Sequence, residues 1–337
     1  YTGGGCPHIL AEPMRTNLYV NSEPTVNEGF EQNTSYESFS WANGFTNCVK
    51  FGDNSVLRAR YGATVPASTE VTLSCFVIMD DLSEPNISNN STLGDFSIVV
   101  GGGASTGVNA NVSMGNNIWK ISKTDTSGTS NLGNNGIVKY TTQSSKGFRV
   151  VGWQMEVGSY GTSYIPNFGT ALGVTRNQDI FTRDGIGSLI NSTEGVLFVE
   201  MAALSDDSDN YISITDGSTV NLIAINLNSS GFVTARYTIA GVTKTFTSTV
   251  ISTNNNKVAI KWKVNDFALW VNGIEIDTDL TLSVLSANTL NTLDFTRSAG
   301  QEFYGKVKQL QVYDTALGGS PYDATLSDTR LAALTSL

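Results

Sequence analysis

Short runs in which apolar and polar residues alternate recur along this 337-residue chain, separated by glycine, asparagine and serine. The clearest run is 70–79, where the apolar residues at 71, 73, 75 and 77 would share one face of a strand. Other runs occupy 49–61, 96–100, 118–121, 136–141 and 148–157. Strands of this length and spacing predict a two-sheet β-sandwich of jelly-roll type in the first half of the chain.

The second half repeats this pattern, with runs at 195–201, 211–215, 222–226, 234–239, 243–249 and 257–264. Its strongest local signal is a hairpin at 267–277, because Asn272-Gly273 is the preferred dipeptide of a type I′ turn. This turn fixes the register, so Trp270 should face Glu275 across the two strands. The expected residues on the non-core face are Trp270, Glu275 and Asp277, and those on the core face are Phe267, Leu269, Val271, Ile274 and Ile276.

The chain divides into three parts. Residues 1–14 are rich in glycine and proline and show no period, so we expect an N-terminal arm or linker. A jelly-roll domain over 15–168 and a second β-sandwich over 169–337 follow, because 337 residues exceed a typical single β core. One short helix is expected at the end, where Ser327 or Asp328 would cap a segment with leucines at 331, 334 and 337.

Charge and cysteine content narrow the function classes. The chain carries 20 Lys and Arg against 30 Asp and Glu, a net charge of −10, which disfavours nucleic acid or an anionic membrane as the main partner. No apolar run approaches the length of a membrane span, so membrane insertion is not expected. Cys6, Cys48 and Cys75 show no C-x-x-C spacing and are expected to be buried free thiols, with one disulfide as the alternative.

The single histidine, His8, lies in the expected arm. A Ser-His-Asp triad, a multi-histidine metal centre or a histidine-based lyase therefore has no place in the expected domains. Glycoside hydrolysis requires only two carboxylates and stays open.

Four short motifs lie at the start of the first domain and around its end: Arg15-Thr16-Asn17-Leu18, Trp153-Gln154-Met155-Glu156, Thr162-Ser163-Tyr164-Ile165-Pro166 and Val174-Thr175-Arg176. The first motif resembles the "R-x-N-L" opening of domains in bacteriophage tail-fibre and appendage proteins. The other three, with Gly158 and Asp179, resemble the "QLE-x-G-(x)-TSYIP … VTR-x-x-D" region of the same proteins. In that family this region closes a domain resembling carbohydrate-binding modules and opens a concanavalin A-like, or laminin-G-like, domain. The resemblance therefore implies that 169–337 is a concanavalin A-like sandwich.

The resemblance also implies a function. The chain would belong to a phage tail fibre or appendage in the virion and would recognise host-surface glycans during adsorption, outside the cell and without catalysis. Its partners would be a host-surface polysaccharide or glycan and other virion proteins. The copies would form a homo-oligomer, with a trimer favoured by the family.

Two alternatives stay open. One is a structural decoration or connector of the virion that binds no glycan. The other is a polysaccharide depolymerase with paired carboxylates, because Glu275-Ile276-Asp277 resembles the start of the E-x-D-x-x-E motif of laminarinase-type hydrolases. Leu280 stands where that motif has its second glutamate, which favours strand alternation as the explanation.

Aromatic rings, on which the C–H faces of sugars stack, are the first candidates for glycan binding, together with arginines and carboxylates that would bind hydroxyl groups. The candidates are Trp41, Arg58, Arg60, Tyr61, Trp119, Trp270, Glu275 and Asp277. Trp41 and Trp119 have a core position as their alternative, Trp270 a half-covered surface position, and the two carboxylates a solvated surface. The long polar loops at 82–93 and 123–135 are further places where binding is expected.

A structural calcium ion is the one cofactor that the sequence suggests. The candidate ligands Asp206, Asp207, Asp209 and Asn210 place oxygen-rich side chains in one loop, for which a solvated acidic turn is the alternative. The resemblance adds Glu156, because similar modules place a metal-coordinating acid at this position. Its alternative is a pair with an arginine.

Overall fold

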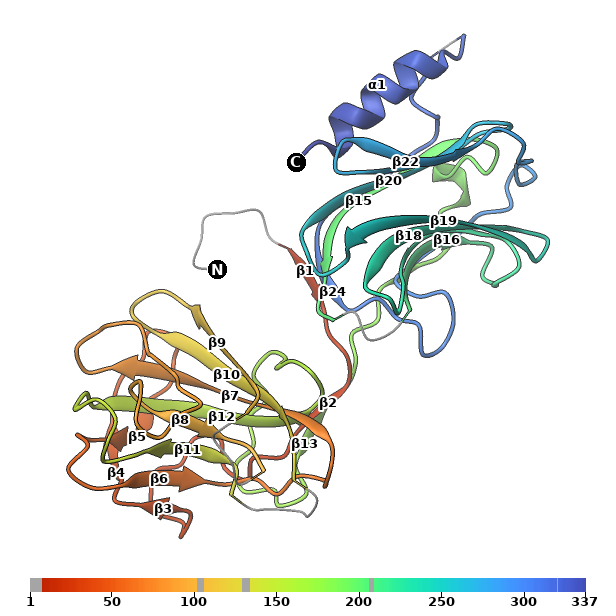
Figure 1. Ribbon diagram of the computed structural model, residues 1–337. Coiled ribbons are helices and arrows are strands. Elements are labelled where there is room, and N and C mark those ends of the chain that lie inside the picture. The colour runs from red at the N-terminus through yellow and green to blue at the C-terminus, as the bar shows by residue number, and fades with distance from the viewer. Residues whose placement is uncertain (1–7, 102–105, 129–133, 206–208, 320) are drawn as a thin grey trace. The chain divides into compact units, whose positions relative to one another are not determined.

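The computed structural model describes residues 8–101, 106–128, 134–205, 209–319 and 321–337. The chain forms two compact units, each built from β-sheets (Figure 1). The first unit is Met14–Asn177, and the second joins residues 8–13 to Gln178–Leu337. The expected all-β class, with two sandwiches and a short C-terminal helix, is confirmed.

The first unit contains a six-stranded and a four-stranded antiparallel sheet. In spatial order the larger sheet is β4 (Ser35–Ser38), β5 (Asn47–Phe51), β12 (Phe148–Val157), β7 (Glu70–Met79), β10 (Trp119–Thr126) and β9 (Val108–Ser113). The smaller sheet is β3 (Glu31–Gln32), β6 (Arg58–Tyr61), β11 (Gly136–Lys139) and β8 (Ser97–Val99). Val71, Leu73, Cys75 and Val77 of β7 all lie in the main core, as their alternation predicted.

The second unit contains two six-stranded antiparallel sheets. One is β1 (Ile9–Ala11), β24 (Gly305–Tyr313), β15 (Gly195–Ala203), β20 (Asn256–Trp262), β21 (Phe267–Val271) and β22 (Ile274–Asp279). The other is β14 (Thr182–Arg183), β23 (Thr292–Asp294), β16 (Asn210–Thr215), β17 (Leu222–Leu227), β18 (Phe232–Ile239) and β19 (Val242–Ile251). A 3-10 turn, η1 (Gly187–Leu189), and helix α1 (Ala324–Thr335) complete the unit.

Both ends of the first unit differ from the expected boundaries. The predicted arm is partly strand, because residues 9–11 pair with residues 305–307 of β24 in the second unit. At the other end, β13 (Val174–Arg176) pairs with β2 (Arg15–Asn17), so the chain stays in the first unit until Asn177. The chain therefore passes between the units twice, after Pro13 and after Asn177.

The hairpin at β21 and β22 has the predicted turn. Asn272 and Gly273 have φ angles of 53° and 85°, as a type I′ turn requires, and Trp270 pairs with Glu275. The register then shifts by one residue, so Asp277 pairs with Leu269 instead of continuing the alternation. The prediction that Ile274 faces the core was wrong, because this side chain beside the turn is exposed.

The N-cap of helix α1 lies four residues before Ser327 and five before Asp328, the two predicted caps. The Asp323 carboxylate accepts a hydrogen bond from the Leu326 amide at 3.1 Å and is the N-cap. The helix packs on the outer face of the sheet that contains β20 and β21, where Leu331 is fully buried. Within the described residues, no helix has the length and apolarity needed to span a membrane.

Cys48 and Cys75 are buried free thiols, as expected. Burial raises the pKa of Cys48 to about 12, and the neighbouring Glu37 carboxylate adds to this rise. Both thiols are therefore protonated at neutral pH and unreactive. Cys6 lies outside the described residues.

Candidate functional site

Three of the predicted sugar-binding residues are buried, so they were wrongly predicted to offer a binding surface. Trp41 is only 3% exposed, because the 39–46 turn folds over the outer face of the larger sheet and packs it against Phe39 and Phe45. Trp270 lies on the non-core face as its register predicted, but helix α1 covers this face and leaves the indole 6% exposed. A sugar cannot stack on either ring.

Arg60 is the third buried residue. Its guanidinium group forms ion pairs with Glu28 and Glu31 and lies over the rings of Tyr19 and Trp153. Full burial of an arginine requires such partners, so its role is to hold the first unit together.

The other predicted sugar-binding residues lie at the surface but do not converge on one site. The Arg58 guanidinium group donates to the carbonyl groups of Asn33 and Asp53. Tyr61 packs beside Tyr140 on the outer face of the smaller sheet, and burial raises its pKa. Trp119 is half-buried against the main core. Glu275 and Asp277 are exposed on β22, in the second unit.

Glu156 is a structural residue and not a free metal ligand. It is fully buried, and its carboxylate accepts hydrogen bonds from the Gln154 side chain at 2.6 Å and from the backbone amide of Thr162 at 2.9 Å. The Thr162 hydroxyl donates to its other oxygen. Protein donors thus take three of the roughly four lone-pair sites of the carboxylate, which accounts for its burial without a metal.

Asn17 has a similar role at the start of the unit. Its amide nitrogen donates to the carbonyl groups of Trp153 and Ile165 and to the Ser22 hydroxyl, at 2.7–3.1 Å. Its oxygen accepts from the backbone amides of Tyr19 and Met155. We call Asn17, Gln154, Glu156 and the segment 162–165 the closure network, since together they satisfy backbone groups that have no partner strand.

The predicted calcium loop gives no metal site within the described residues. Asp206 and Asp207 lie outside them. The Asp209 carboxylate accepts a hydrogen bond from the Ser229 amide at 2.9 Å, and Asn210 is buried at the start of β16. No group of three His, Cys, Asp or Glu side chains in the described ranges is close enough to hold a metal ion.

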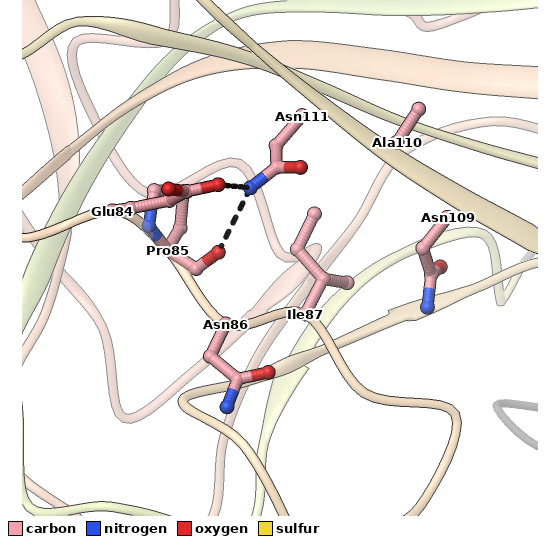
Figure 2. A pocket seen from close by; sticks show the side chains of 7 residues that line it. All are labelled: Glu84, Pro85, Asn86, Ile87, Asn109, Ala110 and Asn111. Atoms are coloured by element: carbon pink, nitrogen blue, oxygen red, sulfur yellow. Dashed lines mark hydrogen bonds between the residues drawn. The ribbon is translucent and has the colours of Figure 1, made fainter.

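A hollow of about 410 Å³ lies at the open edge of the first sandwich, between the edge strand β9 and the segment 84–87. We call it the first hollow; its lining residues are Glu84, Pro85, Asn86, Ile87, Asn109, Ala110 and Asn111. Figure 2 shows Ile87 at its centre, with Asn109 and Asn111 beside it on β9. The Asn111 amide donates to the Glu84 carboxylate at 2.6 Å and to the Pro85 carbonyl at 3.3 Å.

Hydrogen bonds to Asp95 and Phe96 hold the segment 84–88 in place, and one of them joins the Ser88 backbone amide to the Phe96 carbonyl. The Asn86 backbone amide donates to the Asp95 carboxylate at 2.9 Å, and the Asp95 backbone amide donates back to the Asn86 backbone carbonyl at 2.7 Å. Gly94 makes this approach possible: its φ is +70°, and a Cβ atom there would lie 2.6 Å from the Asn86 carbonyl oxygen. The wall of the first hollow is therefore positioned before any ligand binds.

Asn109 has one polar side-chain atom without a partner beside the first hollow. Its amide nitrogen donates to the Asn89 side chain at 3.0 Å, whereas its oxygen is buried and meets no hydrogen-bond donor in the described part of the chain. Lys123, its neighbour on β10, donates instead to the Ile98 carbonyl at 3.1 Å. Burial lowers the pKa of Lys123. Among the lining residues Glu84 carries the one formal charge.

The sequence predicted one wall of the first hollow and missed the other. The polar loop at 82–93 contains Glu84, Asn86 and Ile87. Strand β9 was missed, although its sequence VNANVS alternates strictly between apolar and polar residues. That alternation was the available signal, because it places Asn109 and Asn111 on one face.

No protein-family model and no curated protein matches this chain. Among solved structures, the IT-sialidase carbohydrate-binding module CBM40 of Ruminococcus gnavus, bound to alpha2,3 sialyllactose, is 17% identical. It covers 46% of this chain and 98% of its own, with a TM-score of 0.37. A putative carbohydrate-binding protein of Bacteroides ovatus is 10% identical. The match covers 90% of this chain and 82% of that protein, with a TM-score of 0.32.

Domains LG4-5 of the mouse laminin alpha1 chain are 9% identical, covering 92% of this chain and 90% of theirs, with a TM-score of 0.30. TM-scores this low carry no argument about function. The neighbours also do not support the resemblance to phage tail fibres.

Proposed function

We propose that the first unit binds a neutral glycan in the first hollow and that the chain acts in recognition without catalysis. The observation that carries this proposal is the side-chain set: three asparagine amides and one carboxylate surround an aliphatic side chain, Ile87. Amide groups donate to and accept from sugar hydroxyl groups, a carboxylate accepts from them, and Ile87 offers an apolar contact to ring C–H groups.

The charge of the first hollow favours neutral over acidic sugars. Glu84 would repel the carboxylate of a uronic or sialic acid, and the lining contributes neither lysine nor arginine to bind it. A single carboxylate also favours binding over hydrolysis, because glycosidases commonly need two.

The test is binding of the full chain to an array of neutral, sialylated and sulfated glycans, followed by titration of the best ligand. Asn86 and Asn109 are the residues to change, because the side-chain amide of Asn86 makes no hydrogen bond among the described residues and that of Asn109 makes one. We expect Asn86→Ala and Asn109→Ala each to weaken binding by about five- to tenfold, the value of one hydrogen bond.

Asn43→Ala is the matched control, since Asn43 is an exposed asparagine in the same unit outside the hollow. It should leave affinity unchanged. A folded wild-type chain that binds no glycan, or one that prefers acidic glycans, would contradict the proposal.

We further propose, from the sequence resemblance, that this binding serves phage adsorption. The chain would then belong to a tail fibre or appendage, contact other virion proteins and form a homo-oligomer, with a trimer favoured. A structural calcium ion at the 206–210 loop is part of the same proposal. Light scattering of the pure chain would test the trimer. Competition of host-cell adsorption by free glycan would test the role in adsorption, and the same assay with a chelator would test the calcium ion.

One observation favours the depolymerase alternative. Burial and the neighbouring carboxylates of Asp328 and Asp266 raise the pKa of Glu275, as a general acid requires. Lys261 holds those two neighbours at 3.1 and 2.7 Å, however, and so links them to the docking of helix α1. Release of reducing ends from a host polysaccharide, lost in Glu275→Gln, would establish the enzyme.

A further inference from the structure

A second hollow, of about 530 Å³, lies entirely within the second unit. It is formed by η1 and the residues after it, the turn at 287–288, and the end of β24. The side chains that line it include Ser188, Leu189, Asn191, Asn288 and Asp314.

Hydrogen bonds fix the floor of the second hollow. The Asn191 amide donates to the Asp314 carbonyl at 3.0 Å, which ties η1 to the end of β24. The Asn191 carbonyl accepts from the indole nitrogen of the buried Trp262, also at 3.0 Å. The buried Ser192 hydroxyl accepts from the Leu290 amide at 2.9 Å. The cavity is therefore held open by the fold itself.

Three polar side chains at the rim have no role in this scaffold. The Ser188 hydroxyl, the Asn288 amide and the Asp314 carboxylate are exposed, and none of them makes a hydrogen bond to the residues that the structure describes. Beside them Leu189 is 70% exposed and so offers an accessible apolar side chain.

This set repeats the chemistry of the first hollow. Each hollow combines one carboxylate, Glu84 or Asp314, with asparagine amides and an accessible aliphatic side chain, Ile87 or Leu189. Neither lining contains a lysine or arginine. Uncharged ligands with many hydroxyl groups fit such a surface better than anions or purely apolar molecules.

We propose that the second hollow is a separate binding site for neutral saccharide, so that one chain carries two sites. Two weak sites on one chain give avidity toward a repetitive polysaccharide without any further contact. The second site would function with or without the first, because its residues belong to another unit.

The test uses the full chain and three neutral probes, lactose, maltotriose and N,N′-diacetylchitobiose, titrated calorimetrically. The first site is removed with Asn86→Ala and Asn109→Ala together. The second is removed with Asn288→Gly and Asp314→Asn. Glycine suits position 288, whose φ is +60°, so this change removes the amide without straining the backbone.

Asn265→Gly is the matched control, an exposed asparagine with a φ of +56° outside both hollows. We expect two equivalents of saccharide per wild-type chain and about one in the variant without the first site. That remaining binding should fall at least tenfold when Asn288 and Asp314 are also changed, and Asn265→Gly should change nothing.

The outcomes separate the two proposals. One equivalent per wild-type chain, abolished by the changes at Asn86 and Asn109, overturns the second site and leaves the proposed function intact. Binding lost only on changing Asn288 and Asp314 supports the second site and overturns the first. Binding of no probe, or binding that resists both sets of changes, overturns both.

Discussion

Asn17 and Asn109 lie in the same unit and have the same side chain, yet their surroundings are opposite. Asn17 is fully buried, and its amide makes five hydrogen bonds, all but one to backbone groups. The Asn109 amide makes one, and its oxygen meets no donor among the described residues. The first belongs to the closure network and the second to the first hollow.

The difference shows what each region requires of polar residues. At the closure network the chain must bury backbone amides and carbonyl groups that no strand pairs with, so side chains take the place of the missing strand. At the sandwich edge β9 pairs with β10 on one side only, and the Asn109 side chain there makes a single hydrogen bond, to another side chain. Amide content alone cannot separate these roles, but burial and hydrogen-bond count can.

The largest effect on unfolding free energy is expected for Asn17→Ala, which tests whether the closure network stabilises the first unit. It leaves two buried backbone carbonyls and two backbone amides without a partner, which we expect to cost about 3–4 kcal/mol of unfolding free energy. Urea unfolding followed by fluorescence of the buried Trp153 measures it. A loss no larger than that caused by Asn43→Ala, at an exposed position, would contradict a structural role for Asn17.

Glu156→Gln comes next. The new amide group would face donors, the Gln154 side chain and the Thr162 backbone or hydroxyl, so we expect a loss of about 2 kcal/mol. The loss should be the same in calcium and in chelator, because protein donors already occupy the carboxylate. A loss that vanishes in chelator would instead make Glu156 a metal ligand.

Gly94→Ala tests whether the first hollow is pre-formed. We expect a loss of about 1–2 kcal/mol, since alanine is strained at a φ of +70° and its Cβ would press on the Asn86 carbonyl. Glycan affinity should fall as well, because the 84–88 segment must move. Gly29→Ala is the control: its φ is +86° but nothing lies within 4 Å, so strain alone should leave glycan affinity unchanged.

The smallest effect is expected for Glu275→Gln. The raised pKa of Glu275 means that the folded state favours the protonated acid, so this group loses its stabilising effect as pH rises through the folded pKa. At neutral pH the substitution should therefore stabilise the second unit, by less than about 0.5 kcal/mol for so exposed a group. Thermal unfolding at pH 4 and pH 7 measures this, and a stabilisation confined to pH 4 would contradict it.

Local pattern was sufficient for much of the fold. Strands β7 and β12 have the predicted bounds, and Asn272-Gly273 forms the predicted turn, because alternation and turn chemistry are properties of neighbouring residues. The burial of Trp270 could not be predicted this way. It depends on helix α1, which lies more than fifty residues later in the chain.

The candidate site was only partly predictable for the same reason. The polar loop at 82–93 was recognised, but a loop becomes a hollow only when β9 lies opposite it. Glu156 shows the reverse error, since a carboxylate in a plausible metal position proved to be buried and hydrogen-bonded to Gln154 and Thr162, which lie close to it in sequence. Motif position and side-chain availability are separate questions.

The pairing of β1 with β24 has a consequence for how the chain could be cut or recombined. A fragment starting at Gln178 would lack residues 9–11 and expose the backbone edge of β24. We expect such a fragment to aggregate, because an exposed strand edge pairs with the edge of another molecule. Fusing residues 8–13 back onto such a fragment through a short linker would restore that strand. Exchanging the contiguous segment 178–337 between genes would likewise not transfer the whole second unit. Its edge strand β1 precedes the first unit in the sequence.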